Sequence, residues 1–367
     1  MTDVVFATVD AGGNVPPLKD VAVEVARRGH RVRVLGHEQQ RASFERAGLE
    51  FHAYTGSEWD PTVDRSTPQG IRAFVAEFTG APRGADLTAL LEPGSIAVVD
   101  CMQLAGLKAA QDAGTPTVAL VHSFHAYFDG SWRRGPIGII ARLKGFGARK
   151  LWRNSRTVLV TADRSLDPAG SRTWPDSFVW TGPIQPEPAP SSPVAPPRVL
   201  VSLSTINFPG QQEVLQNVLD GLAAEPIEMV VTTGPAVDPA SLDLPANAEA
   251  HRFLPHDDLM PACSAVIGHG GHSTTMRALA HGLPLVILPM HPMLDQAMVG
   301  KRVEQAGAGV TIKKSSSPTE IRTALDTVLN GKHRAAAKAI AERWRGTDGA
   351  AVAADRILAP SSESVSP

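Results

Sequence analysis

The stretch A-V-I-G-H-G-G-H-S-T-T-M-R-A-L, residues 265–279, decides the fold of the second half of the chain. Its first residues, 265–267, form an apolar run typical of a buried strand. Residues 269–271 predict a tight turn, because glycine tolerates backbone conformations that other residues avoid, and a helix start follows from His272. In parallel α/β sheets, ligands bind beyond the carboxyl ends of the strands, where a helix N-terminus offers backbone N–H groups to an anion. The stretch therefore predicts an anion-binding turn that suits a diphosphate.

Short β-branched runs alternate with helical patterns on both sides of this turn, which predicts parallel sheets covered by helices. A Pro-, Ala- and Ser-rich segment at 186–197 interrupts the pattern and cannot form a core. Because 367 residues are too many for one efficient core, we expect an α/β protein with two Rossmann-like domains. The expected parts are an N-terminal domain (1–185), a linker (186–197), a C-terminal domain (198–345), a helix that packs back on the N-terminal domain (346–360) and a disordered tail (361–367). The expected strands lie at 4–9, 30–36, 96–99, 117–121, 157–161, 199–203, 229–231, 265–267 and 285–288, with late helices at 320–329 and 334–344.

The composition is that of an ordinary globular protein, with 43% hydrophobic and 20% charged residues. A formal net charge of -2 and a pI near 6.6 give no overall attraction to nucleic acid or to anionic membranes. Cys101 and Cys263 lie in apolar, strand-like settings without a metal-binding pattern, so we expect both to be reduced core residues. A signal-peptide pattern and an apolar run of about 18 residues are both missing, and we therefore expect a cytoplasmic protein.

Motifs along nearly the whole chain resemble one enzyme family. Residues 268–309 contain H-G-G-H-S-T-T, A-L-A-H-G-L-P, L-P-M-H-P-M-L-D-Q and G-A-G, preceded by G-N-V-P-P, A-R-R-G-H-R-V, T-G-P-I and V-L-V-S-L-S-T. In this order and spacing they resemble the family 1 glycosyltransferases, bacterial and plant enzymes that use UDP- or TDP-sugars to modify small molecules. The resemblance implies the GT-B architecture, in which two Rossmann-like domains with parallel sheets face each other across a cleft. It also implies that the N-terminal domain binds the acceptor and the C-terminal domain the donor.

The resemblance assigns roles to individual residues of the C-terminal domain. The sugar-binding pair follows the motif L-P-M-H-P-M-L, where the first residue of the pair could equally be the N-cap of a helix. The resemblance places Ser204, Thr205, His269, Gly270, Gly271, Ser273 and Thr274 around the donor diphosphate, Asp295 and Gln296 on the sugar hydroxyls, and Phe253 and Leu254 beside the base.

Two positions depart from the family pattern. Where many members have a glutamate that binds the nucleotide ribose, this chain has Arg277, which cannot accept hydrogen bonds from ribose hydroxyls. The arginine could contact phosphate, bind another part of the donor or face solvent. A deoxyribose has fewer hydroxyls to satisfy, so the departure favours a TDP-sugar over a UDP-sugar.

The second departure concerns the catalytic base. Many members place a histidine in the loop after the first strand, whereas this chain has Asn14, and an amide cannot act as a general base. The base has therefore moved, or the acceptor needs little deprotonation. Candidates follow the ends of the N-terminal strands: Asp100, in the place of the family's orienting aspartate, then His122 and His125, for each of which a structural role is the favoured interpretation. Asp10, Asp129 and Phe124 are expected in the acceptor region.

The expected activity is transfer of a sugar from a TDP- or UDP-sugar, with inversion, to a small acceptor of aromatic or polyketide-like type, by O- or C-glycosylation. The N–H groups of the glycine turn would stabilise the leaving diphosphate. Acidic clusters are missing near the turn, so we expect no metal and no cofactor. The alternative is a nucleotide-sugar-binding homologue without turnover. An oxidoreductase is disfavoured, because the full G-x-G-x-x-G fingerprint and an acidic residue after the second strand are both absent.

Residues 133–156 contain many arginines and lysines, no acidic residue and a partly helical apolar stripe. One interpretation is a helix that binds a membrane surface. The pattern favours instead a solvated basic face on a helix whose stripe covers the acceptor pocket. Nucleic acid is not an expected partner, and the sequence leaves a monomer or a homodimer open.

Overall fold

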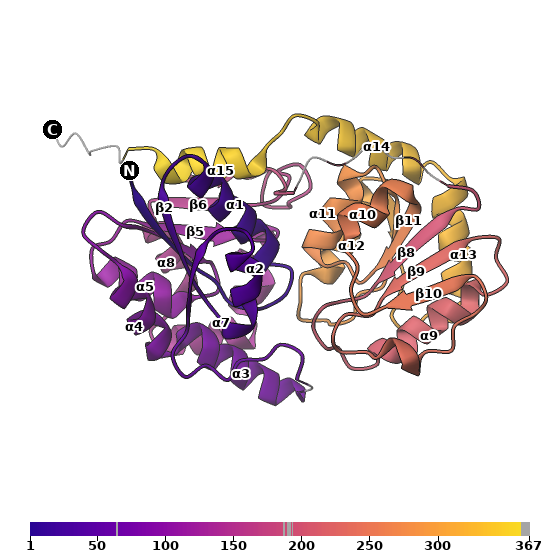
Figure 1. The fold of residues 1–367 in the computed structure, drawn as a ribbon, viewed down its shortest axis with the longest axis horizontal. Coiled ribbons are helices and arrows are strands. Elements are labelled where there is room, and N and C mark those ends of the chain that lie inside the picture. The colour runs from indigo at the N-terminus through magenta and orange to yellow at the C-terminus, as the bar shows by residue number, and fades with distance from the viewer. Residues whose placement is uncertain (64, 186–187, 189–191, 193, 361–367) are drawn as a thin grey trace. The chain divides into compact units, whose positions relative to one another are not determined.

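Figure 1 shows the protein as a computed structural model, which describes residues 1–367 except 64, 186–187, 189–191, 193 and 361–367. The chain forms two compact units. Unit 1 comprises residues 1–59, 65–185 and 348–367, and unit 2 comprises residues 60–64 and 186–347. The predicted tail and part of the predicted linker lie outside the described residues. Among the described residues, no helix combines the length and apolar character needed to cross a membrane.

Unit 1 contains a parallel sheet in the order β3-β2-β1-β4-β5-β6-β7. Strands β2 and β3 lie on one side of β1, and β4 to β7 lie on its other side, so the strand order reverses between β1 and β4. Ligands of doubly wound sheets bind at this reversal of strand order, so the loops after β1 and β4 are the expected binding positions. The strands are β1 (Asp3–Ala7), β2 (Arg31–Gly36), β3 (Glu50–Ala53), β4 (Ile96–Asp100), β5 (Thr117–Val121), β6 (Thr157–Val160) and β7 (Phe178–Trp180).

Helices cover this sheet, and the last helix of the chain belongs to unit 1 (Figure 1). Helix α15 packs against α1, where Ile357 joins the core cluster of the unit and Arg28 forms an ion pair with Asp355. The helical segments are α1 (Val15–Arg27), α2 (Arg41–Glu45), α3 (Thr67–Thr79), α4 (Ala81–Leu90), α5 (Leu104–Asp112), α6 (His125–Tyr127), α7 (Pro136–Leu143), α8 (Ala148–Asn154) and α15 (Gly349–Leu358), with a 3-10 turn η1 (Glu38–Gln40) and a π-helical turn η2 (Phe128–Trp132).

Unit 2 repeats the same construction with a parallel sheet in the order β10-β9-β8-β11-β12-β13. Its strand order reverses between β8 and β11, so the loops after these two strands form the second expected binding position. The strands are β8 (Arg198–Ser202), β9 (Glu228–Thr232), β10 (Ala248–His251), β11 (Cys263–Gly268), β12 (Leu285–Ile287) and β13 (Gly309–Thr311). The helices are α9 (Gln211–Leu222), α10 (His256–Leu259), α11 (His272–Ala280), α12 (Gln296–Gln305), α13 (Pro318–Asn330) and α14 (His333–Trp344), with 3-10 turns η3 (Pro239–Ser241) and η4 (Met260–Ala262).

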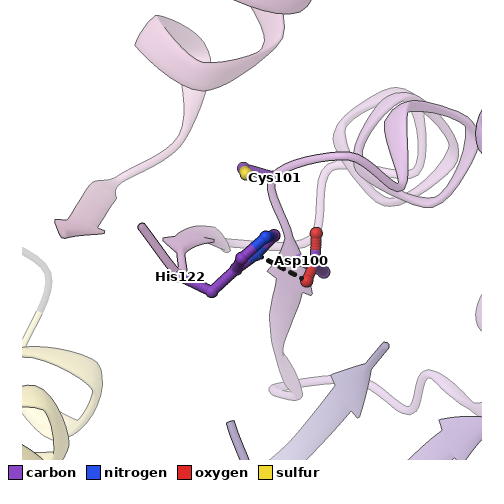
Figure 2. A group of neighbouring side chains, drawn as sticks. All are labelled: Asp100, Cys101 and His122. Atoms are coloured by element: carbon purple, nitrogen blue, oxygen red, sulfur yellow. Dashed lines mark ion pairs between the residues drawn. The ribbon is translucent and has the colours of Figure 1, made fainter. Parts of the chain in front are cut away.

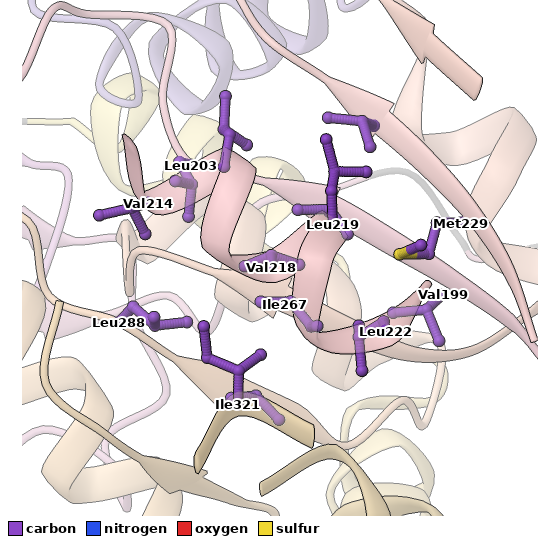
Figure 3. Packing of buried hydrophobic residues seen from close by; sticks show 14 of the residues in the cluster. Val199, Leu203, Val214, Val218, Leu219, Leu222, Met229, Ile267, Leu288 and Ile321 are labelled. Atoms are coloured by element: carbon purple, nitrogen blue, oxygen red, sulfur yellow. The ribbon is translucent and has the colours of Figure 1, made fainter. Parts of the chain in front are cut away.

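The core of unit 2 lies between its sheet and helices α9 and α13. Figure 3 shows Val218 and Leu222 of α9 packed with Ile267 of β11 and Ile321 of α13. Burial of such a side chain stabilises the folded state by about 1.5–3 kcal/mol relative to exposure. This packing holds β11, and with it the start of the turn that follows.

The predicted α/β fold class is confirmed, and every predicted strand forms. Both cysteines are buried and unpaired, as expected.

Candidate active site

The turn between β11 and α11 needs both of its glycines. Gly270 has a φ of 83° and is buried, and a Cβ there would lie 2.8 Å from the carbonyl oxygen of Gln296. A Cβ on Gly271 would lie 2.4 Å from Nε2 of His269. Gly270 is required for two reasons. Other residues rarely adopt a positive φ, and a side chain there would collide with the backbone of Gln296. The sequence G-G therefore allows the chain to turn within two residues from a buried strand into a helix.

Helix α11 begins at this turn without a side-chain cap, since its N-cap is Gly271. Within the described part of the chain, the backbone N–H groups of Ser273 and Thr274 donate to no protein acceptor. The first turn also contains no acidic residue that would compete for them. Open N–H groups and the positive end of the helix dipole form a site for an anion.

We expect Gly270→Ala to weaken binding of a nucleoside diphosphate at least about tenfold, because left-handed backbone costs about 1–2 kcal/mol for alanine and the methyl group displaces the backbone of Gln296. Isothermal titration of the purified variant measures this. Gly29→Ala is the matched control, since Gly29 has the same φ of 83° but a Cβ added there would meet no atom within 4 Å. Equal nucleotide affinity in the Gly270→Ala variant and in the unmodified protein would contradict the site.

His269 is a neutral residue of this turn. Burial lowers its pKa to about 4, while a hydrogen bond with the Ser202 backbone opposes the shift. The imidazole therefore carries no charge near neutral pH and cannot act as the cation of a phosphate site. Its ring packs 6.1 Å from that of Phe208. The negative charge of a bound anion would therefore be stabilised by the backbone N–H groups of the turn.

Ser204 and Thr205 follow β8, on the other side of the strand-order reversal. The hydroxyl of Ser204 accepts a hydrogen bond from the backbone of Ile206 at 2.9 Å, and its own proton remains available to a ligand. Gly234 allows the next loop to approach closely, because a Cβ there would lie 2.4 Å from the Ser204 carbonyl oxygen. Both predicted segments of the diphosphate site thus lie at the reversal point of unit 2.

The predicted sugar-binding pair lies at the start of α12. Asp295 is the N-cap residue, although its side chain makes no capping hydrogen bond. Gln296 is buried, and its Oε1 accepts hydrogen bonds from the backbone N–H groups of Met290 (2.7 Å) and His291 (3.0 Å). Gln296 therefore holds the preceding loop in place, a role that the sequence did not predict.

The departure at Arg277 has a local explanation. Its guanidinium forms an ion pair with Asp257 of α10 at 3.3 Å. The ion pair is made through Nε alone, and the three roles considered for Arg277 remain open. Phe253, predicted beside the base, is 75% exposed, and Leu254 is half-buried.

In unit 1, Asn14, Asp100 and His122 meet at the strand-order reversal. Nδ2 of Asn14 donates to Oδ2 of Asp100 at 2.9 Å and to the carbonyl of Val9 at 2.8 Å. Figure 2 shows the ring of His122 directed toward Asp100, with Nδ1 of the histidine 3.1 Å from Oδ2 of the carboxylate. Asp100 is fully buried, whereas the His122 side chain keeps 12% of its surface exposed. A buried carboxylate thus lies beside a partly accessible imidazole at ion-pair distance, although Nδ1 of His122 makes no hydrogen bond among the described residues.

Cys101 lies in the same group, and potential ligand atoms of Asp100, Cys101 and His122 lie within 4.8 Å of one another. The donor atoms do not suit a metal ion, because the carboxylate is already used on both oxygens. Oδ1 of Asp100 accepts from the backbone of Met102 at 2.9 Å, and Oδ2 faces Asn14 and His122. Burial also raises the pKa of the Cys101 thiol well above its usual value, which opposes the thiolate that a metal would need.

The other N-terminal candidates have surroundings of their own. His125 is buried among the rings of Trp152, Trp174, Phe178 and Trp180, and burial lowers its pKa. These contacts favour a structural role for His125. Phe124 is fully buried, Asp129 is buried in ion pairs with Arg133 and Arg149, and the Asp10 carbonyl accepts from Trp59 at 2.6 Å.

Asp167 organises the segment that follows β5, and the sequence did not predict this role. Its buried carboxylate accepts hydrogen bonds from the backbone N–H groups of His125 (2.8 Å), Ala126 (3.2 Å) and Ala169 (2.9 Å) and from the indole of Trp180 (3.0 Å). The start of α6, three residues after His122, is therefore fixed by a residue from a distant loop.

Comparisons with known proteins agree with this geometry. Residues 216–351 match the family model of the C-terminal domain of erythromycin biosynthesis protein CIII-like proteins. The chain is 26% identical to 4'-demethylrebeccamycin synthase of Lentzea aerocolonigenes over 96% of its own length and 98% of the relative. It is 29% identical to L-demethylnoviosyl transferase of Streptomyces niveus over 72% of its length and 70% of the relative. The crystal structure of the calicheamicin glycosyltransferase CalG4 superposes with a TM-score of 0.79, at 25% identity, over 98% of this chain and all of that one.

Together with these relatives, the two parallel-sheet units define the class: the protein is a glycosyltransferase with the GT-B fold. Within that class the chain is similar to glycosyltransferases of natural-product pathways.

Proposed function

We propose that the protein transfers a sugar from a TDP- or UDP-sugar to a small, aromatic or polyketide-like acceptor, with inversion at the anomeric carbon. The observation that carries the proposal is the open N-terminus of α11 behind the turn at Gly270 and Gly271. Its N–H groups would bind the diphosphate and stabilise the negative charge that develops as this group leaves. TDP is the preferred nucleotide, because Arg277 is engaged by Asp257 and supplies no acceptor for ribose hydroxyls.

We further propose that His122 is the general base of O-glycosylation. A hydrogen bond from Nδ1–H of His122 to Asp100, whose Oδ2 lies 3.1 Å away, would leave Nε2 unprotonated and able to take the proton of the acceptor hydroxyl. The resulting oxygen lone pair forms the new bond to the anomeric carbon as the bond to the diphosphate oxygen breaks. Asn14 occupies the family's usual base position, and its Nδ2 would hold the carboxylate that orients His122. The base would thus have moved from the loop after β1 to the end of β5.

A metal ion has no part in this proposal, because backbone N–H groups supply the electrostatic stabilisation of the leaving diphosphate. The same arrangement supports a nucleotide-sugar-binding homologue without turnover less well. Loss of the base would leave Asp100 without an imidazole partner, whereas Asp100 and His122 lie in contact.

Thermal unfolding with TDP, UDP, GDP and NAD tests the donor site. We expect TDP to raise the midpoint most and UDP next, since a ligand at 100 times its dissociation constant adds about 2.7 kcal/mol of stability. Turnover of the matching nucleotide-sugar should persist in the presence of EDTA. Stabilisation by NAD alone would contradict the proposal, and donor binding without transfer or hydrolysis would favour the homologue without turnover.

A further inference from the structure

Helix α7 exposes the large side chains of the apolar stripe found in residues 133–156. Ile139 is 45% exposed, Ile140 37% and Leu143 77%, whereas the buried residues of the helix are Gly138 and Ala141. The large side chains of α7 thus point away from the interior of unit 1, and its small residues face inward.

Exposed cations lie on α7 and on the two helices packed against it. Helix α7 packs against α3, beside which Figure 1 shows it, and against α8; we call the outer surface of these three helices the α7 face. Its cations Arg72, Arg134, Arg142, Lys144, Lys150 and Arg153 are exposed, and within the described residues none of them has a carboxylate partner.

Acidic residues on the α7 face are buried or absent. Glu77 of α3 is buried and forms ion pairs with His37 and Arg83, while α7 and α8 contain no acidic residue. Asp129, buried beside α7, neutralises Arg133 and Arg149 and leaves the outer cations uncompensated. The chain as a whole has a formal charge of -2, so this face is a local concentration of positive charge on a nearly neutral protein.

From this arrangement we propose that the α7 face binds the surface of an anionic lipid membrane. Leu143 and Ile139 would enter the boundary between headgroups and acyl chains, while the surrounding long basic side chains reach lipid phosphates. A second copy of the chain fits less well, because a symmetric contact through this face would bring like charges together. Membrane binding would place the enzyme where apolar acceptors accumulate.

Vesicle co-sedimentation of the full chain tests the proposal. We expect binding to vesicles of phosphatidylcholine with phosphatidylglycerol, little binding to phosphatidylcholine alone, and weaker binding as salt screens the charges. Arg142→Gln with Lys150→Gln should lower the partition coefficient about 25-fold, from about fivefold per cation. Ile139→Ser with Leu143→Ser should lower it at least about tenfold.

Matched variants separate a specific face from a general effect of charge or hydrophobicity. Lys332→Gln with Lys338→Gln removes the same charge from unit 2, and Leu244→Ser removes an apolar side chain that is 43% exposed. Both control proteins should bind vesicles like the unmodified chain. Equal loss in control and test variants would overturn the proposal, as would a dimer in solution that Ile139→Ser with Leu143→Ser converts to a monomer. Donor binding, measured separately, is independent of either result.

Discussion

Replacing His122 by glutamine is expected to lower kcat about 10²- to 10⁴-fold, the usual contribution of a well-placed general base. Glutamine keeps a similar volume beside Phe128, whose ring lies 5.1 Å from that of His122, so the fold should be preserved. The nucleotide affinity should not change, because the diphosphate site lies in unit 2. Steady-state kinetics with a saturating nucleotide-sugar, together with titration of the nucleoside diphosphate, measure the two effects.

The pH dependence distinguishes a base from a structural residue. The rate with a general base rises as pH rises through the pKa of that base, since only the unprotonated form accepts a proton. The His122→Gln variant should lose this acidic limb, and its residual rate should rise only with the ionisation of the acceptor. Asp100→Asn should also lower kcat, because an amide no longer holds the required tautomer.

His52→Gln is the control substitution for this experiment, since His52 lies on β3 and contacts Glu50 at the surface. It should leave kcat within about twofold. A His122→Gln variant with unchanged kcat and an unchanged acidic limb would remove the histidine from the mechanism. Loss of activity on Asp100→Asn alone would then assign the base to the aspartate.

The strands at the centres of both sheets could be predicted from the sequence because they are buried on both faces. The run at 96–99 and that at 265–267 are almost entirely apolar, and their burial leaves no competing interpretation. The edge strands were missed for the opposite reason. Residues 248–251 (A-E-A-H) are partly exposed and contain no β-branched residue, so their sequence resembles that of a loop. Residues 178–180 are strand formers, but a run of three is too short to show a period.

The contact between Asp100 and His122 could not be predicted from the sequence, because it depends on how β4 and β5 are aligned in the sheet. Residues 100 and 120 are paired between β4 and β5, and His122 follows two positions later on the same side of the sheet as Leu120. The sequence identified both residues as candidates, because each follows a strand, but it could not bring the two side chains together. The same limit applies to Arg277 and Asp257, whose ion pair joins two helices of unit 2.

Asp167→Ala is expected to reduce the free energy of unfolding by about 3–5 kcal/mol, because it leaves several buried donors without an acceptor. These donors are the N–H groups of His125, Ala126 and Ala169 and the indole of Trp180. Asp167→Asn should reduce the free energy of unfolding by a smaller amount, since its amide oxygen still accepts hydrogen bonds while its NH₂ group would face other donors. Denaturant unfolding followed by tryptophan fluorescence reports directly on the aromatic cluster around His125.

Asp176→Ala is the control for Asp167→Ala. It tests whether removal of any carboxylate from the segment between β6 and β7 lowers the free energy of unfolding. Asp176 is exposed and has no hydrogen-bond or ion-pair partner among the described residues, so its loss should change stability by less than about 0.5 kcal/mol. Because Asp167 also fixes the chain three residues beyond His122, its alanine variant should lower kcat at temperatures where the protein remains folded. A variant with native stability and native kcat would show that packing of the tryptophan cluster alone holds this segment in place.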